Sequence, residues 1–542
     1  MTVQAEHSRR SEAIAAHGMV ATSQPLATEV GVDILKQGGH VIDAAIAANA
    51  MLGLVEPMSC GLGGDLFAIV WDAQTNALHG FNGSGRAPQA MTRDLFSSRG
   101  LDRIPERGPL SWTVPGCVDG WFALHKRFGR LPIKQLLAPT IAYAESGFPV
   151  TPVIARMWKT AEERLRADPG AATFLVGDRA PEVGEVFRNP DLARSLREIC
   201  ATGRDAFYCG KISEQIAACA ERVGGLLAPE DLASHRSTWG DPVSMTYRGY
   251  DIWELPPNGQ GIAALQMLGI LEGFDVSSMA RDGAELLHLQ IEAKKRAYED
   301  RARYYADPEF ADVPVDGLIS KPYAAQRRRQ ILQSHAALRV PAGDPRLQLG
   351  DTVYLTAVDS ERNAVSLIQS IYYDFGSGIV PPGTGFALQN RGNLFHLDAN
   401  HPNGLEPGKR PFHTIVPAFV TREGKPLFSF GVMGGDMQPQ GHVQILLNRL
   451  DFGMDVQAAG DAPRWRHVGS STPTGDQMND GGTVWLERGF PQASIDGLRA
   501  KGHQVQIRAT GFGGYQGIWI DEETGMLRGG SEPRKDGCAL GF

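Results

Sequence analysis

The pattern of apolar and polar positions predicts helices near the start of the chain. Pro25–Lys36 has apolar residues at helical spacing and ends at a pair of glycines, and Val41–Val55 is apolar on almost every side, as in a buried helix. A glycine-rich loop, Ser59–Asp65, then precedes a strand over Leu66–Trp71. A dinucleotide-binding loop follows a strand and opens a helix, so the reverse order here favours a tight turn with close backbone packing.

Helical patterns continue through the middle of the chain, from 132 to about 232. A further helix is predicted over Glu285–Tyr305, with its charged residues on the outer side and His288 as a packed or surface histidine rather than a metal ligand. From Arg327 to Leu349 the chain is polar and basic, which predicts a solvated helix that runs into a mobile linker.

The last third of the chain alternates between strands and turns. Val353–Val358 and Ala364–Tyr373 flank a turn cluster and predict a hairpin. Two more strands, Ile415–Val420 and Leu427–Val432, lead to Gly434-Gly435, after which apolar spacing predicts a helix. A strand followed by paired glycines and a helix N-terminus presents backbone N–H groups to an anion. Beside a nucleophile, such a turn would form an oxyanion hole.

Composition and charge exclude several classes of protein. The 542 residues are 42% hydrophobic and carry a formal net charge of −8, which argues against a nucleic-acid-binding surface. The N-terminus lacks an apolar signal segment, and no run of about 18 apolar residues predicts a membrane span. The six cysteines have no metal-ligand spacing, which predicts reduced thiols in a cytoplasmic protein. We expect neither a metal nor a cofactor.

The start of the hairpin suggests a nucleophile. Thr352 opens its first strand, directly after Asp351. If cleavage made Thr352 an N-terminus, its α-amine, with a reference pKa of roughly 7.7, could act as the base that its hydroxyl needs. Ser370 on the second strand could hydrogen-bond the Thr352 oxygen, and Gly434 and Gly435 could bind the oxyanion.

With these motifs the sequence resembles the γ-glutamyltransferase family of N-terminal-nucleophile hydrolases, over nearly the whole chain. The likeness is carried by these segments in order: 18–22, 61–65, 86–88, 114–116, 351–352, 375–379, 407–411, 434–435, 462–464 and 533–537. The resemblance implies a mixed α/β (α+β) fold, a four-layer αββα sandwich. It also implies self-cleavage between Asp351 and Thr352 into a large subunit (1–351) and a small subunit (352–542). These pieces would stay together as a heterodimer, alone or as a pair of heterodimers.

The substrate pocket departs from the γ-glutamyl pattern. Ser84 stands where the family places an arginine for the substrate carboxylate, and Tyr372 replaces an asparagine. Asn393 replaces the acidic residue that holds the substrate ammonium. Arg391 replaces a neutral residue, and a Ser-Ser pair is replaced by His413-Thr414.

Losing both partners of a zwitterion should cost several kcal/mol of glutamate recognition, because each charged substrate group would be left unpaired. The departures resemble a γ-glutamyltransferase-like branch that includes an amidohydrolase acting on oxamate, a small anionic amide. Arg391 or Arg86 could then pair with the substrate carboxylate, while a structural ion pair is the alternative role for Arg391.

Two other functions remain open from the sequence. The chain could retain γ-glutamyl transfer or glutathione hydrolysis, or it could be a catalytically silent scaffold. The presence of Thr352, Ser370 and Gly434-Gly435 argues against the scaffold.

Overall fold

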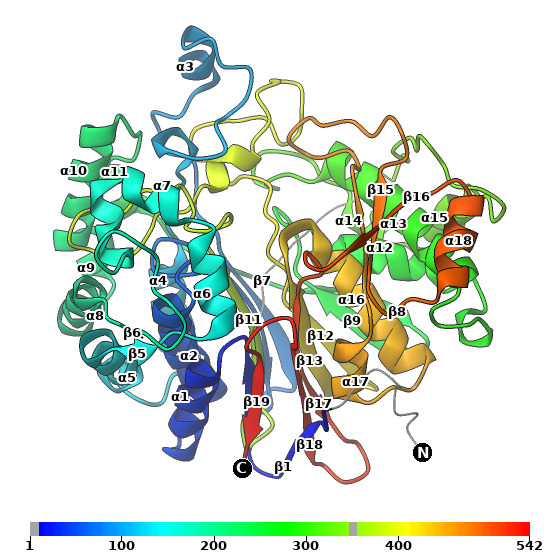
Figure 1. The fold of residues 1–542 in the computed structure, drawn as a ribbon, viewed down its shortest axis with the longest axis horizontal. Helices are drawn as coiled ribbons and strands as arrows, with labels where there is room; N and C mark the ends of the chain where they lie inside the picture. Colours follow the sequence, from blue (N-terminus) through cyan, green and yellow to red (C-terminus); the bar gives the residue numbers. More distant parts are fainter. Residues whose placement is uncertain (1–9, 346–354) are drawn as a thin grey trace.

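The computed structural model describes residues 10–345 and 355–542. Two seven-stranded sheets face each other at the centre, with helices on both outer sides (Figure 1). This is the four-layer αββα sandwich that the sequence predicts, and it belongs to the α+β class. Within each sheet, neighbouring strands are antiparallel.

The first sheet, here the β13 sheet, has the order β1-β18-β17-β13-β12-β9-β8, and the second, the β11 sheet, has the order β19-β2-β10-β11-β3-β4-β7. The strands of the β13 sheet are β1 (Ala13–Ala15), β8 (Val243–Tyr247), β9 (Tyr250–Glu254), β12 (Ala418–Arg422), β13 (Lys425–Met433), β17 (Gly514–Ile520) and β18 (Leu527–Ser531). Those of the β11 sheet are β2 (Met19–Thr22), β3 (Asp65–Asp72), β4 (Ala77–Gly83), β7 (Thr238–Gly240), β10 (Leu355–Val358), β11 (Ala364–Ser370) and β19 (Cys538–Gly541).

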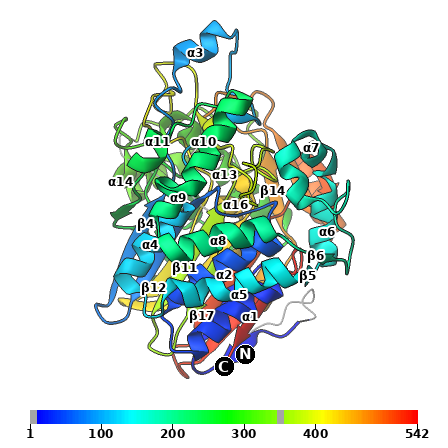
Figure 2. The ribbon, with the colours of Figure 1, turned by 90° about the vertical axis from the view of Figure 1, so that its left-hand side faces the viewer.

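Helices cover the outer face of each sheet. On the β11 side, α1 and α2 have the predicted bounds and pack under α5 and α8 (Figure 2). The helices of this side are α1 (Pro25–Lys36), α2 (Val41–Val55), α3 (Arg93–Ser98), α4 (Cys117–Phe128), α5 (Ile133–Ser146), α6 (Pro152–Lys159), α7 (Glu162–Ala167), α8 (Pro190–Thr202), α9 (Asp205–Tyr208), α10 (Lys211–Val223) and α11 (Pro229–Ser234). The β13 side carries α12 (Ile262–Leu271), α13 (Ala284–Tyr304), α14 (Val315–Leu318), α15 (Lys321–Arg328), α16 (Gln438–Leu446), α17 (Val456–Asp461) and α18 (Gln492–Ala500).

Smaller strands complete the structure. A three-stranded sheet, β14 (Trp465–Val468), β15 (Thr483–Glu487) and β16 (Gln504–Arg508), lies outside the two large sheets, and β5 (Phe148–Pro149) pairs with β6 (Val186–Phe187). In the two described ranges, no helix combines the length and the apolar character needed to cross a membrane.

Alternation along β11 decides which side chains face which layer. Val365 and Leu367 pack into the core beneath α1 and α2, whereas Ala364 and Ile368 pack between the two sheets. Side chains two apart on a strand share a face, so Ser370 also points towards the β13 sheet. The hairpin's second strand ends at this residue, three short of the predicted Tyr373.

Strands from before and after residue 351 are interleaved in both sheets. In the β11 sheet, β10 from the later part pairs with β2 from the earlier part, and β11 pairs with β3. In the β13 sheet, β12 pairs with β9. The two parts therefore share both central sheets instead of forming separate domains.

The prediction that α13 exposes its charged side chains is wrong. Glu292, Lys294, Lys295, Arg296, Asp300 and Arg301 are each at most 2% exposed. They are buried because other segments, including 329–345 and the turn after β13, pack over this face of the helix and supply partners for the charges.

The prediction of a solvated helix and mobile linker after Arg327 is wrong in part: many residues of 329–345 are exposed as predicted, but Arg327 is buried and the backbone is anchored. Arg327 is 1% exposed and pairs with Asp300 at 3.1 Å. Residues 329–345 are held by hydrogen bonds to α13, for example from Lys295 Nζ to the Ala337 carbonyl at 2.8 Å. Residues 346–349, and the Val353 start of the predicted strand, lie outside the described residues.

Candidate active site

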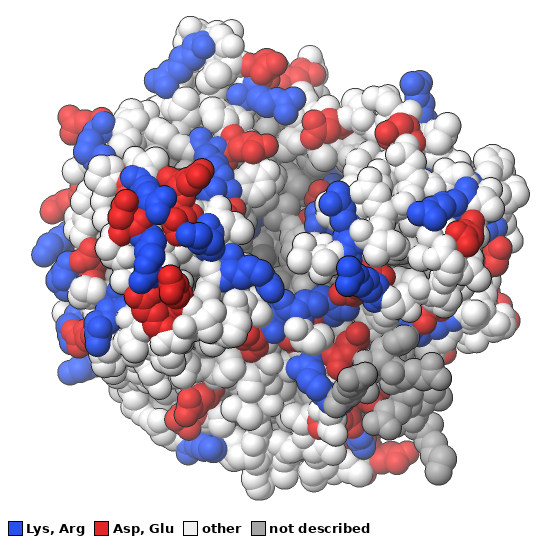
Figure 3. Space-filling view, in the orientation of Figure 1, with Lys and Arg blue, Asp and Glu red and all other residues white. Residues whose placement is uncertain are grey.

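A cavity of about 1100 Å³ lies at the end of the two sheets where β11 and β13 finish. Figure 3 shows the corresponding face hollowed near its centre, with Lys and Arg side chains on both sides of the hollow. Six of the predicted site residues line this cavity: Ser370, Tyr372, Asn393, Thr414, Gly434 and Gly435. Segments far apart in the sequence thus meet at one place.

Ser370 occupies the last position of β11, at the bottom of the site. Its Oγ accepts a hydrogen bond of 2.8 Å from the backbone N–H of Tyr372, so its own hydrogen is free to be donated elsewhere. The glycine-rich loop packs directly against it: a Cβ at Gly64 would lie 2.3 Å from the Ser370 carbonyl oxygen. This confirms the predicted close backbone packing. Asp351 and Thr352, the predicted cleavage point and nucleophile, lie outside the described residues.

The paired glycines form the turn between β13 and α16. Gly434 and Gly435 have φ angles of +130° and +60°, in the region that favours glycine. Residues Gly435–Met437 make one short helical turn, and α16 begins at Gln438, which also lines the cavity. The predicted order of strand, paired glycines and helix N-terminus is therefore present, at the cavity wall.

A buried network holds this turn in place, and the sequence reasoning missed its members. Gln260 Nε2 donates to the carbonyls of Gly435 and Thr414, both at 3.2 Å. Arg301 Nη1 donates to Asp436 Oδ1 at 2.6 Å and also to Gln260 Oε1. Burial raises the pKa of Asp436, but Arg301 outweighs this and holds it below its ordinary value, so the carboxylate stays charged. No local motif around Gln260 signals this role.

Arg391 lies behind the cavity wall. Its side chain is fully buried, its Nη1 donates to Thr414 Oγ1 at 2.7 Å, and its guanidinium carbon lies 4.8 Å from the centre of the Tyr372 ring. Tyr372 and Thr414 line the cavity, whereas Arg391 does not. The positive charge of Arg391 therefore reaches the cavity through these two side chains rather than by direct contact.

Asp65 and His413 form a buried polar pair beneath the site. Asp65 accepts hydrogen bonds from the N–H groups of Gly85 (3.0 Å) and Gly116 (3.1 Å) and from Gln389 Nε2 (2.9 Å). His413 Nδ1 accepts from the N–H of Ile415, which leaves Nε2–H to donate to Asp65 at 3.1 Å. Burial, followed by the charge of Arg391, holds the pKa of His413 well below its ordinary value, so the ring is neutral. His413 does not line the cavity.

Of the remaining predicted residues, one lines the cavity and the others lie away from it. Asn393 lines the cavity and donates from Nδ2 to the Ile104 carbonyl at 2.8 Å. Arg86 lies away from the cavity, where it binds both carboxylate oxygens of Glu309 at 2.7 and 2.9 Å. Ser84 is fully buried and bonded to Asn82. No charged side chain thus faces the cavity from the position where γ-glutamyl enzymes carry their arginine.

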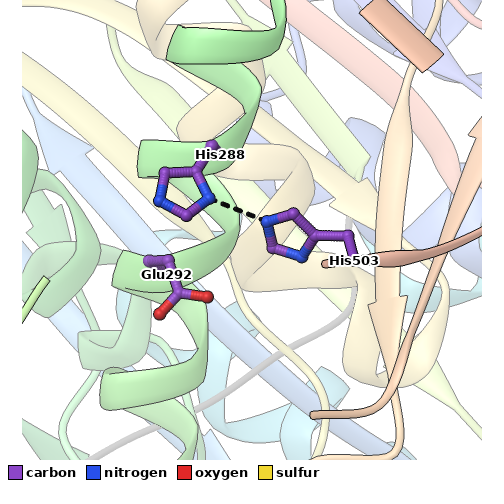
Figure 4. Close-up of side chains that lie close together, drawn as sticks. All are labelled: His288, Glu292 and His503. Atoms are coloured by element: carbon purple, nitrogen blue, oxygen red, sulfur yellow. Dashed lines mark hydrogen bonds between the residues drawn. The ribbon is translucent and has the colours of Figure 1, made fainter. Parts of the chain in front are cut away.

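Among the described residues, one group has the composition of a metal site: His288, Glu292 and His503 (Figure 4). The two imidazoles are hydrogen-bonded directly, with 2.8 Å between His288 Nδ1 and His503 Nε2. Glu292 is already paired with Lys295 at 2.9 Å and Arg296 at 2.8 Å. A cation would have to displace two positive charges from its only anionic ligand, so this cluster does not suit a metal.

Comparisons with known proteins agree with this geometry. Residues 27–542 match the family described as Gamma-glutamyltranspeptidase. The chain is 40% identical to the glutathione hydrolase-like YwrD proenzyme of Bacillus subtilis, over 97% of this chain and 98% of that protein. It is 36% identical to the oxamate amidohydrolase proenzyme of Klebsiella pneumoniae, over 98% and 100%. The crystal structure of a cephalosporin acylase from Bacillus halodurans superposes with a TM-score of 0.91 at 45% identity, covering 99% of this chain and 97% of that one.

Replacing Gly64 with alanine should displace the end of β11. The new Cβ would meet the Ser370 carbonyl oxygen and the Gln369 amide, at 2.3 and 2.5 Å. Such overpacking typically costs about 1–3 kcal/mol, so the melting temperature of a chain of this length should fall by about 1–3 °C. Gly240→Ala is the matched control, because nothing lies within 4 Å of its added Cβ. Equal melting temperatures for the two variants would contradict the close packing beneath Ser370.

The free energy of unfolding should depend on pH in a way that reflects the raised pKa of Asp65. Burial raises its pKa from 3.8 to about 6, despite the opposing charge of Arg391. Because the folded state binds this proton more tightly than the unfolded state, stability from Asp65 is present at low pH and is lost as pH rises from about 4 to 6. The loss is on the order of 3 kcal/mol.

The melting temperature of the wild type minus that of Asp65→Asn should therefore decrease as the pH is raised from 4 to 7. Asp72, at the other end of β3, is the control. Its hydrogen bonds, chiefly from Thr75, outweigh burial and lower its pKa, so the difference between wild type and Asp72→Asn should rise with pH. A difference for Asp65 that stays constant or rises with pH would refute the assignment.

Proposed function

Because the chain belongs to the gamma-glutamyltranspeptidase family of N-terminal-nucleophile hydrolases, we propose that it is a threonine amidohydrolase that cuts itself between Asp351 and Thr352. The observation that carries this proposal is the meeting of Ser370 and Gly434-Gly435 at one cavity, beside the strand that follows Thr352. Related chains of this family are proenzymes, as their names state.

The register of the hairpin supports Thr352 as the nucleophile. Leu355 pairs with Leu367, and each step back along β10 is a step forward along β11. In the cleaved enzyme we propose that this pairing continues by three positions, which would set Thr352 opposite Ser370. The Ser370 hydroxyl, which already accepts from Tyr372 N–H, would then donate its hydrogen to the Thr352 oxygen.

The proposed reaction uses one nucleophile twice. The Thr352 hydroxyl first attacks the Asp351 carbonyl carbon, the peptide C–N bond breaks, and water hydrolyses the resulting ester to leave Thr352 with a free amine. In the mature enzyme that amine takes the hydroxyl proton as Oγ1 attacks the substrate amide, and the leaving amine receives it. Water then resolves the acyl-enzyme. The N–H groups of Gly434 and Gly435 hold the oxyanion, a contribution of typically about 3 kcal/mol per donor.

The two products of cleavage would remain one molecule. Residues 1–351 and 352–542 both contribute strands to each sheet, so separation would break both ladders and the three largest apolar clusters. We propose a stable heterodimer of large and small subunits, alone or as a pair of heterodimers. All six cysteines are free thiols, which fits a cytoplasmic location.

For the substrate we propose an anionic amide that lacks a neighbouring ammonium group. Asn393 offers no charge for an ammonium, and Arg391 places a buried positive charge behind Tyr372 and Thr414. Oxamate fits this chemistry and is the named substrate of one relative. Tyr372, Asn393 and Thr414 would contact it directly, while Arg391 and His413 would act from behind; Arg86, paired with Glu309, would act only through the loop that it holds.

The cavity volume favours a larger substrate as the second candidate. About 1100 Å³ accommodates a drug-sized ligand, and oxamate would leave most of it unfilled. Glutathione, or an acylated amine with a bulky leaving group, would fill it better. Two similar proteins, named a glutathione hydrolase-like proenzyme and a cephalosporin acylase, match over nearly the whole chain.

Substitutions should separate the nucleophile from its neighbour. Thr352→Ala should abolish both self-cleavage and amide hydrolysis, whereas Ser370→Ala should slow both by about 10- to 100-fold through loss of one hydrogen bond to a reacting oxygen. Ser366→Ala, on the same face of β11, should cleave and turn over like the wild type. Cleavage is followed by gel electrophoresis and hydrolysis by ammonia release. An uncut Thr352→Ala protein with wild-type turnover would refute the mechanism.

A pair of chromogenic substrates should reveal the missing ammonium site. Glutaryl-p-nitroanilide and γ-glutamyl-p-nitroanilide differ only by the α-amino group, so the first should have the higher kcat/KM, by tenfold or more. Oxamate and glutathione are assayed beside them. A preference for the γ-glutamyl compounds would instead establish glutathione hydrolysis.

A further inference from the structure

The segment 329–345, here called the strap, runs along α13 and leads to the cleavage point. We propose that α13 anchors the strap in order to present the bond between residues 351 and 352 for self-cleavage, with Asp300 as the central positioning residue. This inference rests on the proposed function and concerns a different step from substrate turnover. Gly343 precedes Thr352 by nine positions.

The first half of the strap is bonded through its backbone to side chains of α13. His288 Nε2 contacts the Leu332 carbonyl at 2.9 Å, which fixes the orientation of the imidazole pair in Figure 4. Glu292 Oε1 accepts from the N–H of Ala337 at 3.2 Å, and Lys295 Nζ donates to the carbonyl of the same residue at 2.8 Å. Arg296 Nη2 donates to the Gln330 carbonyl.

The second half of the strap is anchored at Asp300. Its Oδ1 accepts from the N–H of Gly343 at 2.8 Å and pairs with Arg327 at 3.1 Å. Arg327 Nη1 in turn donates to the Pro341 carbonyl at 3.0 Å. Tyr304 donates from its hydroxyl to the Gly343 carbonyl at 2.5 Å. Both backbone groups of Gly343 are thus held by side chains of one helix.

Packing at Gly343 makes this anchor specific. A Cβ at this position would lie 1.9 Å from the Tyr323 hydroxyl oxygen, and that hydroxyl donates to Asp300 Oδ2 at 2.9 Å. No side chain larger than hydrogen fits between the strap and the Asp300 cluster. The strap can therefore approach α13 closely at this one point.

The arrangement of charge argues for a positioning role. Asp300 and Arg327 are at most 1% exposed, and burying such charges costs free energy that apolar side chains would not. These charges instead fix the path of the strap, because they form hydrogen bonds with its backbone at defined positions. An anchor nine residues before the nucleophile shortens the chain that must close on it, which lowers the entropy cost of the attack. After cleavage the same contacts would retain the end of the large subunit.

The test compares cleavage rates of freshly synthesised precursors. Gly343→Ala, which forces the strap away from Tyr323, should cleave at least tenfold more slowly than the wild type. Tyr304→Phe, which removes one hydrogen bond, should cleave a few-fold more slowly. Arg339→Ala is the matched control, because this strap residue is exposed and, among the described residues, no side-chain hydrogen bond or ion pair joins it to α13. This variant should cleave at the wild-type rate.

Turnover by the cleaved fraction separates positioning from general stability. Once cut, the Gly343→Ala and Tyr304→Phe enzymes should have kcat and KM within about twofold of the wild type. Cleavage at the wild-type rate in both variants would overturn the inference, as would kcat falling in step with cleavage. A wild type that stays uncut would overturn the proposed function itself.

Discussion

The register between β10 and β11 is the constraint on which the site depends. It is held on one side by β2 and on the other by β3, and a slip of one residue would turn every apolar side chain of β11 to the wrong layer. Ala364 and Ile368 would leave the core between the sheets, and Val365 and Leu367 would leave the core under α2. The cost of such a slip fixes Ser370 at the cavity.

Buried charged and polar side chains fix the course of the backbone at two places in this protein. Arg301 and Gln260 hold the turn at Gly435 and Asp436. The residue before Arg301 in α13, Asp300, holds the strap. One helix thus supports both the Gly434-Gly435 turn and the strap. Its buried charges fix the backbone geometry, at a cost in desolvation free energy that an apolar face would not have.

Much of the fold could be predicted from local pattern. The α1 and α2 helices have their predicted bounds because apolar spacing and the glycine pair at 38–39 are local signals. The Gly434-Gly435 turn was also predicted, because its motif lies in one short segment, whereas the αββα arrangement was expected from the family resemblance. The cavity brings together six of the predicted residues.

Long-range contacts could not be predicted in this way. The charged face of α13 looked solvated because its partners, such as Asp436, lie 135 residues away. Arg391 was assigned to a substrate carboxylate because spacing alone cannot show that Tyr372 and Thr414 lie between it and the cavity. Arg86 was a candidate for the same reason, although Glu309 neutralises it. The roles of Gln260 and Asp65 depend on the assembled sheets and leave no mark in a single segment.

The most direct measurement of the central claim is the intact mass of freshly purified wild-type protein. The account predicts two polypeptides whose masses meet at the bond between Asp351 and Thr352, with a small chain that begins at an unmodified Thr352. A single chain of 58.6 kDa, or a cut at any other bond, would contradict it.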